Sequence, residues 1–490
     1  MSGYSDIPNG SIVDQSICGF FARSKSATLD NAARRELVSR SRILYLESPI
    51  ARACIDILLR ECVGSGLRYA PAETSPYFDN YTAITNALSS DLSKASALHM
   101  IENTRRLTFV QVQALVFRTI LLSGDCFVVT LDDGSICIKE SDYVFTPAFL
   151  NPVAETGVAY FEGRVVIDGV ELSETGNPVA YWMCNNLYGQ RELRENWTRV
   201  PVYDENGVKQ VLHCAYFERP GQVRGLPLLS PVIEDLWSLR AYLTSETQMA
   251  ILQANMSLIV TTNTNPTTNP FAALSQADLD APLVTEPPKE REKSGDFSIA
   301  PPPMSEALYN GMLRKTNFVS AGQSIHLAEG EDVKMITPTA PHSGLETFIR
   351  CVCEQIGAAV GIPSQILLAR IDSNYASVKA AFAELQHTVR LYRSMFTETF
   401  LKPFFEGFVY RDIIDHGWSS DKYDEQSAAL LLATESIWLP SVPPTVLEPN
   451  REIEFYAKAL ELGLVSRDEV AVMLFGHEAN GENTSNPIIE

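Results

Sequence analysis

The chain has 490 residues, with 39 Lys and Arg against 60 Asp and Glu, which gives a formal net charge of −21. Its 45% hydrophobic and 20% charged residues are typical of a folded protein large enough to divide into two or more domains. The strong negative charge argues against a protein that grips duplex DNA by neutralising many phosphates.

The negative charge is concentrated at the end of the chain. Residues 412–490 hold 15 Asp and Glu and 4 Lys and Arg, a net charge of 4 − 15 = −11, about half of the whole excess. A solvated acidic surface is the commoner reason for such a bias, and an acidic rim or channel wall is the alternative.

The nine cysteines are scattered and include no C-x-x-C pair, which predicts reduced thiols rather than a disulfide framework or a metal site. There is no signal-peptide pattern, and the best candidate for a membrane span, 109–122, is too short and contains Arg118. We therefore expect a soluble protein that is made inside the cell and needs no cofactor.

The first 227 residues predict a flexible arm (1–28), then helices, then a β-rich block. Helical patterns cover 30–46, a segment that begins at Ser48-Pro49 and stops at Gly64, and 108–122. In the β-rich block, Asn-Gly and Asp-Gly pairs tolerate positive φ and therefore predict hairpin turns. These turns are Asp132-Asp133-Gly134, Asp168-Gly169 and Asn206-Gly207.

A long helix follows a strand at 211–217. Ser230 is its expected N-cap and Pro231 its first residue, and no Pro or Gly interrupts the run to Met256, so the rod is ~40 Å long. Glu234, Asp235 and Glu246 give the helix an excess of negative charge. A solvated face is the common reason for such an excess, and a face toward DNA is the alternative.

The second half of the chain predicts two more helices around a short polar turn. Residues 257–341 begin with a strand and become Pro-rich, with a strand pair expected at 324–327 and 333–336. Apolar residues then recur at helical spacing over 345–360, until Gly361 and Pro363 stop the pattern. A second apolar stripe runs from Val378 to Phe404, and Pro403 is expected to kink its end.

Several segments in this order resemble one known family. They are ERPGQVRGLP at 218–227, PVAYW at 178–182, AAVGIP at 358–363 and NYASVKAA at 374–381. Together they are similar to the lambda-type portal proteins of bacteriophages, and the resemblance extends over roughly residues 30–480. The chain departs from the family pattern with Ala376 for Ser, Lys379 for Arg and Gln386-His387 where a Trp is usual.

The resemblance implies an α+β, mostly helical portal fold with wing, stem, clip and crown regions. The implied regions, after the arm at 1–28, are the wing at 29–227, a stem helix at 228–256, the clip at 257–341, a second stem helix at 342–363, a tunnel loop at 364–378, a long wing helix at 379–412 and an acidic crown at 413–490.

The resemblance also implies a role that is structural and not enzymatic. Family members form a dodecameric ring at one capsid vertex, which nucleates procapsid assembly and serves as the channel for DNA packaging and ejection. The implied partners are further copies of the chain, double-stranded viral DNA, the terminase large subunit, the major capsid protein or scaffold, and head-completion or tail connector proteins. The implied location is the host cytoplasm during assembly and then the virion, with no membrane contact, no cofactor and no metal.

The implied DNA-contacting residues lie in the polar turn between the last two helices. Arg370 would touch phosphates transiently, and the polar residues after it would form a weakly adhesive wall. An ordinary interhelical connection is the alternative. The implied tunnel-loop residues are Leu368, Arg370, Ile371, Asp372, Ser373, Asn374 and Tyr375.

Two other functions remain open at this point. One is another virion connector or adaptor ring, although such proteins are generally much shorter. The other is a metal-dependent nuclease, which requires a cluster of carboxylates. The chain contains no G-x-x-x-x-G-K-[ST], G-x-S-x-G or H-E-x-x-H motif, and its seven histidines show no ligand spacing.

Overall fold

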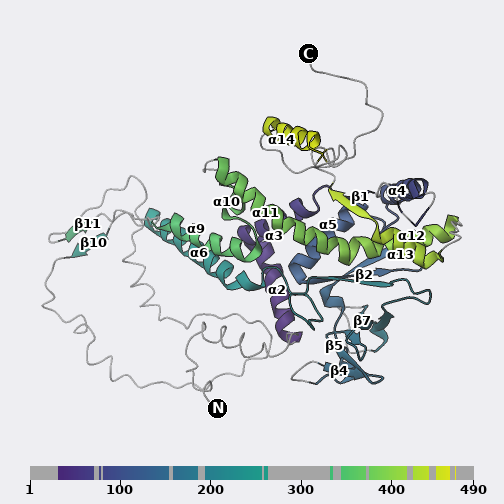
Figure 1. The fold of residues 1–490 in the computed structure, drawn as a ribbon. Helices are drawn as coiled ribbons and strands as arrows, with labels where there is room; N and C mark the ends of the chain where they lie inside the picture. The colour runs from purple at the N-terminus through teal and green to yellow at the C-terminus, as the bar shows by residue number, and fades with distance from the viewer. Residues whose placement is uncertain are drawn as a thin grey trace, which may run out of the picture. The chain divides into compact units, whose positions relative to one another are not determined.

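The computed structural model divides the chain into two compact units (Figure 1). The first unit comprises Met1–Leu239 with Ile349–Glu490, and the second comprises Arg240–Phe348. The structure describes residues 31–70, 75, 77–78, 81–153, 158–185, 194–255, 259–262, 331–334, 344–370, 375–416, 423–440, 449–463 and 470. The arm predicted at 1–28 lies outside the described residues.

The fold is mostly helical, and two helices, α6 and α9, continue from one unit into the other. None of the helices that the structure describes is both long enough and apolar enough to cross a membrane. The described helices are α2 (Asn31–Glu47), α3 (Pro49–Cys62), α4 (Tyr81–Ala97), α5 (Phe109–Ser123), α6 (Ile233–Asn255), α9 (Leu345–Val360), α10 (Ser364–Leu367), α11 (Tyr375–Phe396), α12 (Lys402–His416), α13 (Glu425–Thr434) and α14 (Pro449–Glu461).

Side-chain caps explain where the predicted N-terminal helices begin. The Ala51 amide donates to the Ser48 hydroxyl at the start of α3, as the Ser-Pro pair predicts. At the start of α5, Thr108 and Gln111 form a reciprocal capping box. The expected cap of α6 is wrong. Its first turn is a 3₁₀ turn at Ser230–Val232 with Leu229 at the N-cap, and no side chain caps it.

The described residues of the first unit form three antiparallel sheets. β2 is the middle strand of a three-stranded sheet in the order β3-β2-β9, while β4 to β8 form a five-stranded sheet in sequence order and β1 pairs with β12. Their bounds are β1 (Leu67–Ala70), β2 (Asp125–Thr130), β3 (Ile136–Glu140), β4 (Val158–Phe161), β5 (Arg164–Ile167), β6 (Val170–Leu172), β7 (Pro178–Cys184), β8 (Trp197–Pro201), β9 (Val211–Ala215) and β12 (Ile437–Pro440).

Two of the three predicted hairpin turns are confirmed together with their strand pairs. The turn at 132–134 joins β2 to β3, and Asp168-Gly169 joins β5 to β6 with φ values of 45° and 83°. At Asn206-Gly207 the predicted turn forms, since Tyr203 and Lys209 pair as an antiparallel bridge and the Asp204 amide donates to the Val208 carbonyl at 2.8 Å. The predicted strand pair is not observed there, because β8 and β9 on either side of the turn belong to different sheets.

Pro403 changes the helical geometry without ending the helix. The residues between α11 and α12, Thr397–Leu401, form a π-helical turn that the Lys402 amide closes on the Thr397 carbonyl. Because Pro403 has no N–H, the Thr399 carbonyl loses its usual helical donor. The Cys214 thiol of β9 donates to this carbonyl instead, at 3.5 Å.

The main core lies where the N-terminal helices meet α11 and α12. Leu58 of α3, Phe117 of α5 and Phe400 are almost completely buried there. Phe400 and Phe404, four residues apart, stack with ring centroids 5.8 Å apart, and Phe109 stacks on Phe404 at 4.9 Å. Helical spacing therefore produces a continuous aromatic row that is covered by a helix from the other end of the chain.

The second unit is small. Its strands are β10 (Ile259–Thr262) and β11 (Glu331–Lys334), which pair with each other, and Tyr242 of α6 packs on Phe348 of α9 with ring centroids 4.6 Å apart. The strand after the long helix is thus confirmed. The strand predicted at 324–327 lies outside the described residues, and the observed partner of β11 is β10.

Candidate functional site

The ERPGQ segment follows β9 and packs against the end of α5. The Leu228 amide donates to the Leu121 carbonyl at 2.9 Å. Gly225 lies so close to Gly124 that a Cβ atom on Gly225 would be 1.9 Å from the Gly124 carbonyl oxygen. The Gly124-Asp125 turn and the Arg224-Gly225 pair therefore require glycine because the two backbones touch.

Arg224 is the central residue of this region. Its side chain is only 4% exposed, and its guanidinium donates to both carboxylate oxygens of Asp125, at 2.5 and 3.1 Å. It also donates to the Asp168 carbonyl at 2.7 Å, the Val144 carbonyl at 2.8 Å and the Ser141 hydroxyl at 2.9 Å. One side chain thus joins β2, the turn after β3 and the β5–β6 hairpin.

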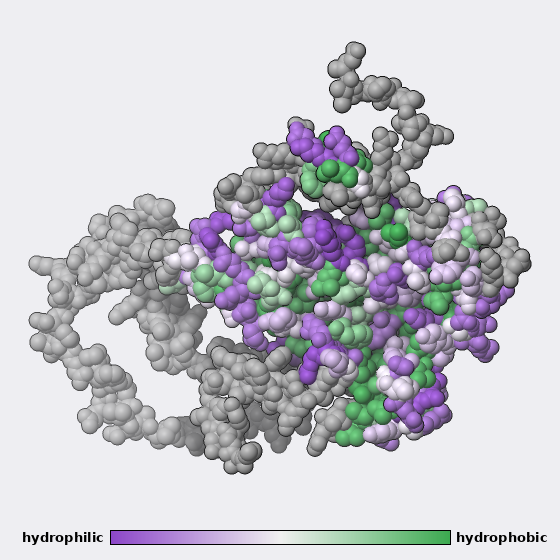
Figure 2. Space-filling model, viewed as in Figure 1, coloured by the Kyte–Doolittle hydropathy of each residue, from purple (hydrophilic) through white to green (hydrophobic). Residues whose placement is uncertain are grey.

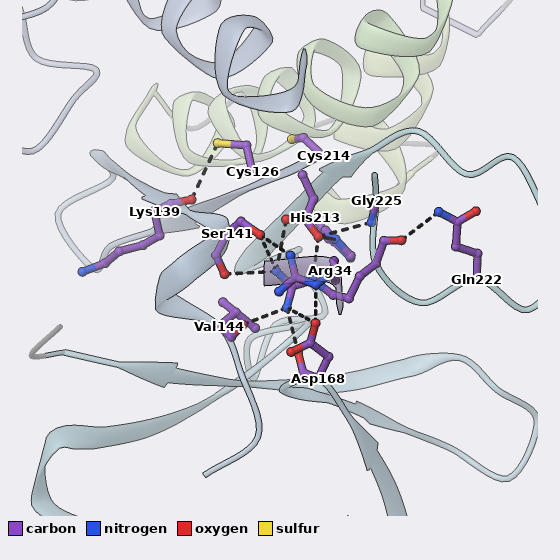
Figure 3. A network of polar contacts seen from close by, with 12 residues as sticks. Arg34, Cys126, Lys139, Ser141, Val144, Asp168, His213, Cys214, Gln222 and Gly225 are labelled. Atoms are coloured by element: carbon purple, nitrogen blue, oxygen red, sulfur yellow. Dashed lines mark hydrogen bonds and ion pairs between the residues drawn. The ribbon is translucent and has the colours of Figure 1, made fainter. Parts of the chain in front are cut away.

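Arg34 of α2 completes the network from the opposite end of the sequence. It donates to the Asp168 carboxylate and, at 2.6 Å, to the Ser141 hydroxyl, and its side chain is almost fully buried. Two guanidinium groups therefore face two carboxylates, Asp125 and Asp168, in a region closed to solvent (Figure 3). Their charges balance, which is the condition under which buried ions are tolerated.

His213 of β9 lies at the edge of the network. Its ring stacks on Phe127 with centroids 4.4 Å apart, and its Nε2 atom is 3.4 Å from an Asp125 oxygen. Burial lowers the pKa of His213, and the nearby Arg224 and Arg34 add to the effect, while Asp125 opposes it. Burial would raise the pKa of Asp125, but Arg224, His213 and Arg34 together hold it well below its usual value.

Sequence reasoning missed this network. Arg224 and Asp125 each lie in a segment that resembles the portal family, yet nothing in their local patterns shows that they pair across 99 residues. His213 is one of the seven histidines without ligand spacing, and its stacked, buried ring makes it a core residue. The network holds elements together and contains no group arranged for nucleophilic attack.

The predicted tunnel loop begins as the end of a short helix. The Arg370 amide donates to the Gln365 carbonyl and the Ala369 amide to the Ile366 carbonyl, at 3.0 and 3.1 Å. This is the Schellman arrangement, with Ala369 at φ 50° in the position that glycine usually occupies. Leu368 is half-buried and packs against the main core, whereas Arg370 is exposed.

The structure describes the predicted loop only at its two ends. Ile371, Asp372, Ser373 and Asn374 lie outside the described residues, and Tyr375 is described only as the first residue of α11. The structure therefore brings the two ends of the predicted loop together and leaves the orientation of its polar side chains as a prediction.

The three carboxylates of the long helix have different surroundings. Glu234 is exposed and lies 3.5 Å from Arg40 of α2, and Asp235 is half-buried. In the second unit, Glu246 is half-buried and accepts a hydrogen bond from Tyr242, whose pKa is raised first by burial and then by Glu246. Their predicted orientation toward DNA stays a prediction.

A cavity of about 330 Å³ lies beside the ERPGQ segment, lined by Leu37, Tyr216, Gln222 and Tyr392 among others. Its lining is mainly apolar. Within the part of the chain that the structure describes, no three His, Cys, Asp or Glu side chains come together as a metal site would require.

Replacing Asp125 by Asn should destabilise the protein by about 3–5 kcal/mol, because Arg224 would stay buried without its counter-charge. Urea denaturation measures the change. Glu354→Gln is the control, since it removes one partner of an exposed ion pair on α9 and should cost less than about 0.5 kcal/mol. Equal effects of the two substitutions would contradict the assigned role of the network.

The lowered pKa of His213 predicts a pH effect. The unfolded state binds this proton near pH 6.5 and the folded state only at lower pH, so stability should fall as the pH drops below about 6.5. Between pH 7 and 5 the loss should reach at most about 2 kcal/mol. His213→Gln should reduce this loss, and His387→Gln, an exposed control on α11, should not. Asp125 stays ionised throughout this range, because its pKa is lowered.

Comparison with known proteins identifies the family. The family described as "Phage portal protein, lambda family" matches residues 16–393 of the chain. No curated protein matches the chain.

Several solved structures are similar to the chain. One is the neck of a native gene transfer agent particle computed with C12 symmetry, with 12% identity, 90% of this chain and 93% of that chain covered, and a TM-score of 0.46. Another is the virion of the native gene transfer agent particle, with 13% identity, coverage of 91% and 94%, and a TM-score of 0.43. A third is an HK97 family phage portal protein from Corynebacterium diphtheriae, with 11% identity, coverage of 70% and 85%, and a TM-score of 0.32.

The family match includes both the Arg224 network and the helix–turn–helix of α9, α10 and most of α11. It extends over 393 − 15 = 378 of the 490 residues. The chain therefore belongs to the lambda family of phage portal proteins, which are structural components of the capsid and not enzymes.

Proposed function

We propose that this chain forms a dodecameric ring at one capsid vertex and that viral DNA enters and leaves the capsid through the ring. The observation that carries this proposal is the match to the portal family over residues 16–393. The match lacks the crown, the first part of the arm and the end of the long wing helix, and it includes every other predicted region in full. As a portal, the ring would nucleate procapsid assembly, dock the terminase large subunit, and later bind head-completion or tail connector proteins.

We assign the regions of a portal subunit as follows. The wing comprises α2 to α5 with the β-rich sheets, α6 and α9 are the stem helices, and α11 is the core of the long wing helix. The separate compact unit at Arg240–Phe348 supports the assignment of residues 257–341 to the clip, because an insertion between two helices folds apart from the main core. The acidic residues 413–490, which include the end of α12, are assigned to the crown.

Exposed apolar side chains support assembly with other copies or with capsid proteins. Phe455 and Leu462, on and just after α14, are 65% and 72% exposed. Figure 2 shows hydrophobic residues at the surface over α14, beside strongly hydrophilic ones. Exposed apolar patches of this kind mark interaction sites in soluble proteins, and a subunit in a ring has two neighbours to cover them.

The charge of the chain suits a channel for DNA. With a net charge of −21 per chain, a ring of such subunits is strongly negative overall and would not grip the phosphates of a passing duplex. Arg370 is an exposed cation at the start of the proposed tunnel loop. One such residue per subunit gives a weak, salt-screened attraction that permits sliding.

Electron microscopy of the purified protein tests the proposal directly. We expect closed rings with a central pore wide enough for duplex DNA, together with a native mass that is a whole multiple of the 54.2 kDa subunit. A compact monomer that cleaves DNA only with a divalent metal would favour the nuclease instead. A ring that assembles only on a preformed neck would favour an adaptor.

Replacing Asp372 and Tyr375 together by Ala tests the tunnel loop. We expect particles with shortened or poorly retained genomes, because the loop contacts the DNA, while rings still form. The readouts are the length of encapsidated DNA and the fraction retained after packaging. Asp132→Ala with Tyr160→Ala is the matched control at exposed positions of the wing and should leave both values unchanged. Failure of the loop variant to form rings would contradict the assignment.

A further inference from the structure

The turn between α9 and α10 lies directly on α11. The Thr388 hydroxyl of α11 donates to the Gly361 carbonyl at 2.9 Å. Gly361 has a φ of 73°, and a Cβ atom there would lie 2.7 Å from the Thr388 hydroxyl oxygen. Glycine is therefore required at this turn both by its backbone conformation and by the close approach of the Thr388 side chain.

A second contact holds α10 to the first turn of α11. The Gln365 side-chain amide donates to the Ser377 hydroxyl at 3.4 Å. On the inner side of the same segment, Ile362 and Leu367 are buried, and the Ile362 amide donates to the Gly357 carbonyl at 2.8 Å. Residues 361–370 are thus folded back along α11 by hydrogen bonds on one side and apolar packing on the other.

α11 is itself fixed to the N-terminal helices. Arg393 donates to the carbonyls of Glu61 and Cys62, at 2.7 and 3.2 Å, where α3 ends. These are carbonyls that the end of a helix leaves without partners, so Arg393 both caps α3 and anchors α11. Thr388 lies between this anchor and the proposed tunnel loop.

α10 ends at Ala369, whose φ of 50° lies in the left-handed region that favours glycine. The Schellman hydrogen bonds of the Ala369 and Arg370 amides hold this conformation locally. The contacts with α11 then fix the position of the whole segment.

We propose that Thr388 is a positioning residue for the tunnel loop. By holding the Gly361 carbonyl on α11, it keeps residues 361–370, which include the first residues of the loop, folded back along α11. This inference rests on the proposed function, because it needs the loop to contact DNA.

Thr388→Val and Thr388→Ser, made in the full-length chain, separate the hydroxyl from the shape of the side chain. Valine is close in shape and cannot donate to Gly361, whereas serine keeps the donor. Hydrogen exchange of the amides of Ile366, Leu367, Leu368 and Arg370 should quicken about tenfold in the valine variant and return toward the normal rate in the serine variant. Rings should form in both.

Encapsidated DNA provides the functional readout. The valine variant should retain less DNA than the wild type, and the serine variant should restore retention. Thr434→Val is the matched control, since Thr434 makes a hydroxyl-to-carbonyl bond within α13, far along the chain from the loop. Ser377→Ala removes the hydroxyl that Gln365 contacts and replaces the valine variant in both measurements if that variant does not fold. It should change exchange and retention in the same direction.

Two results would overturn this inference, and they are distinguishable. Unchanged exchange and retention in the valine variant, with reduced retention in the Asp372 and Tyr375 variant, would remove the role of Thr388 alone. Unchanged retention in all of these variants would remove the tunnel-loop assignment itself, and the inference with it.

Discussion

The buried pair of Arg224 and Asp125 is the interaction on which the arrangement of the first unit depends. Burying two charges is costly unless each finds its partner and its remaining hydrogen bonds, and here Arg224 makes bonds to four further groups of Ser141, Val144 and Asp168. Those groups belong to the turn after β3 and to the β5–β6 hairpin, so the pair forms only when both sheets are in place. Arg34 extends the same requirement to α2.

This dependence explains the role of the ERPGQVRGLP segment, whose residues Arg224 and Gly225 hold other elements of the fold together. Gly225 allows the backbone to touch Gly124, and that contact brings Arg224 to Asp125. The network fixes the start of α6 relative to the sheets, because the same segment leads directly into that helix. In the proposed ring, such a rigid base would keep α6 and α9 fixed while DNA moves past them.

Local patterns were sufficient for most of the helices and hairpins. Ser48-Pro49, the Thr108 capping box and Asp168-Gly169 each act over a few residues, and each is observed as its chemistry predicts. Predictions failed where a distant part of the chain decided the outcome. Asn206-Gly207 carries hairpin chemistry, but the strands around it pair in different sheets. α4 and α13 were not predicted, and α13 packs against α12 to complete the core.

By itself the sequence determined the family, most of the helices and hairpins, and the break between α9 and α11. The reason is that motif spacing, caps and glycines act locally and do not depend on how the rest of the chain is arranged. Only the tertiary structure decided that Arg224, Asp125, Asp168 and Arg34 share one buried network and that Thr388 meets Gly361. The physical reason is that these contacts join residues 27 to 134 positions apart, and a pairing of charges or hydroxyls over such distances leaves no periodicity in the sequence.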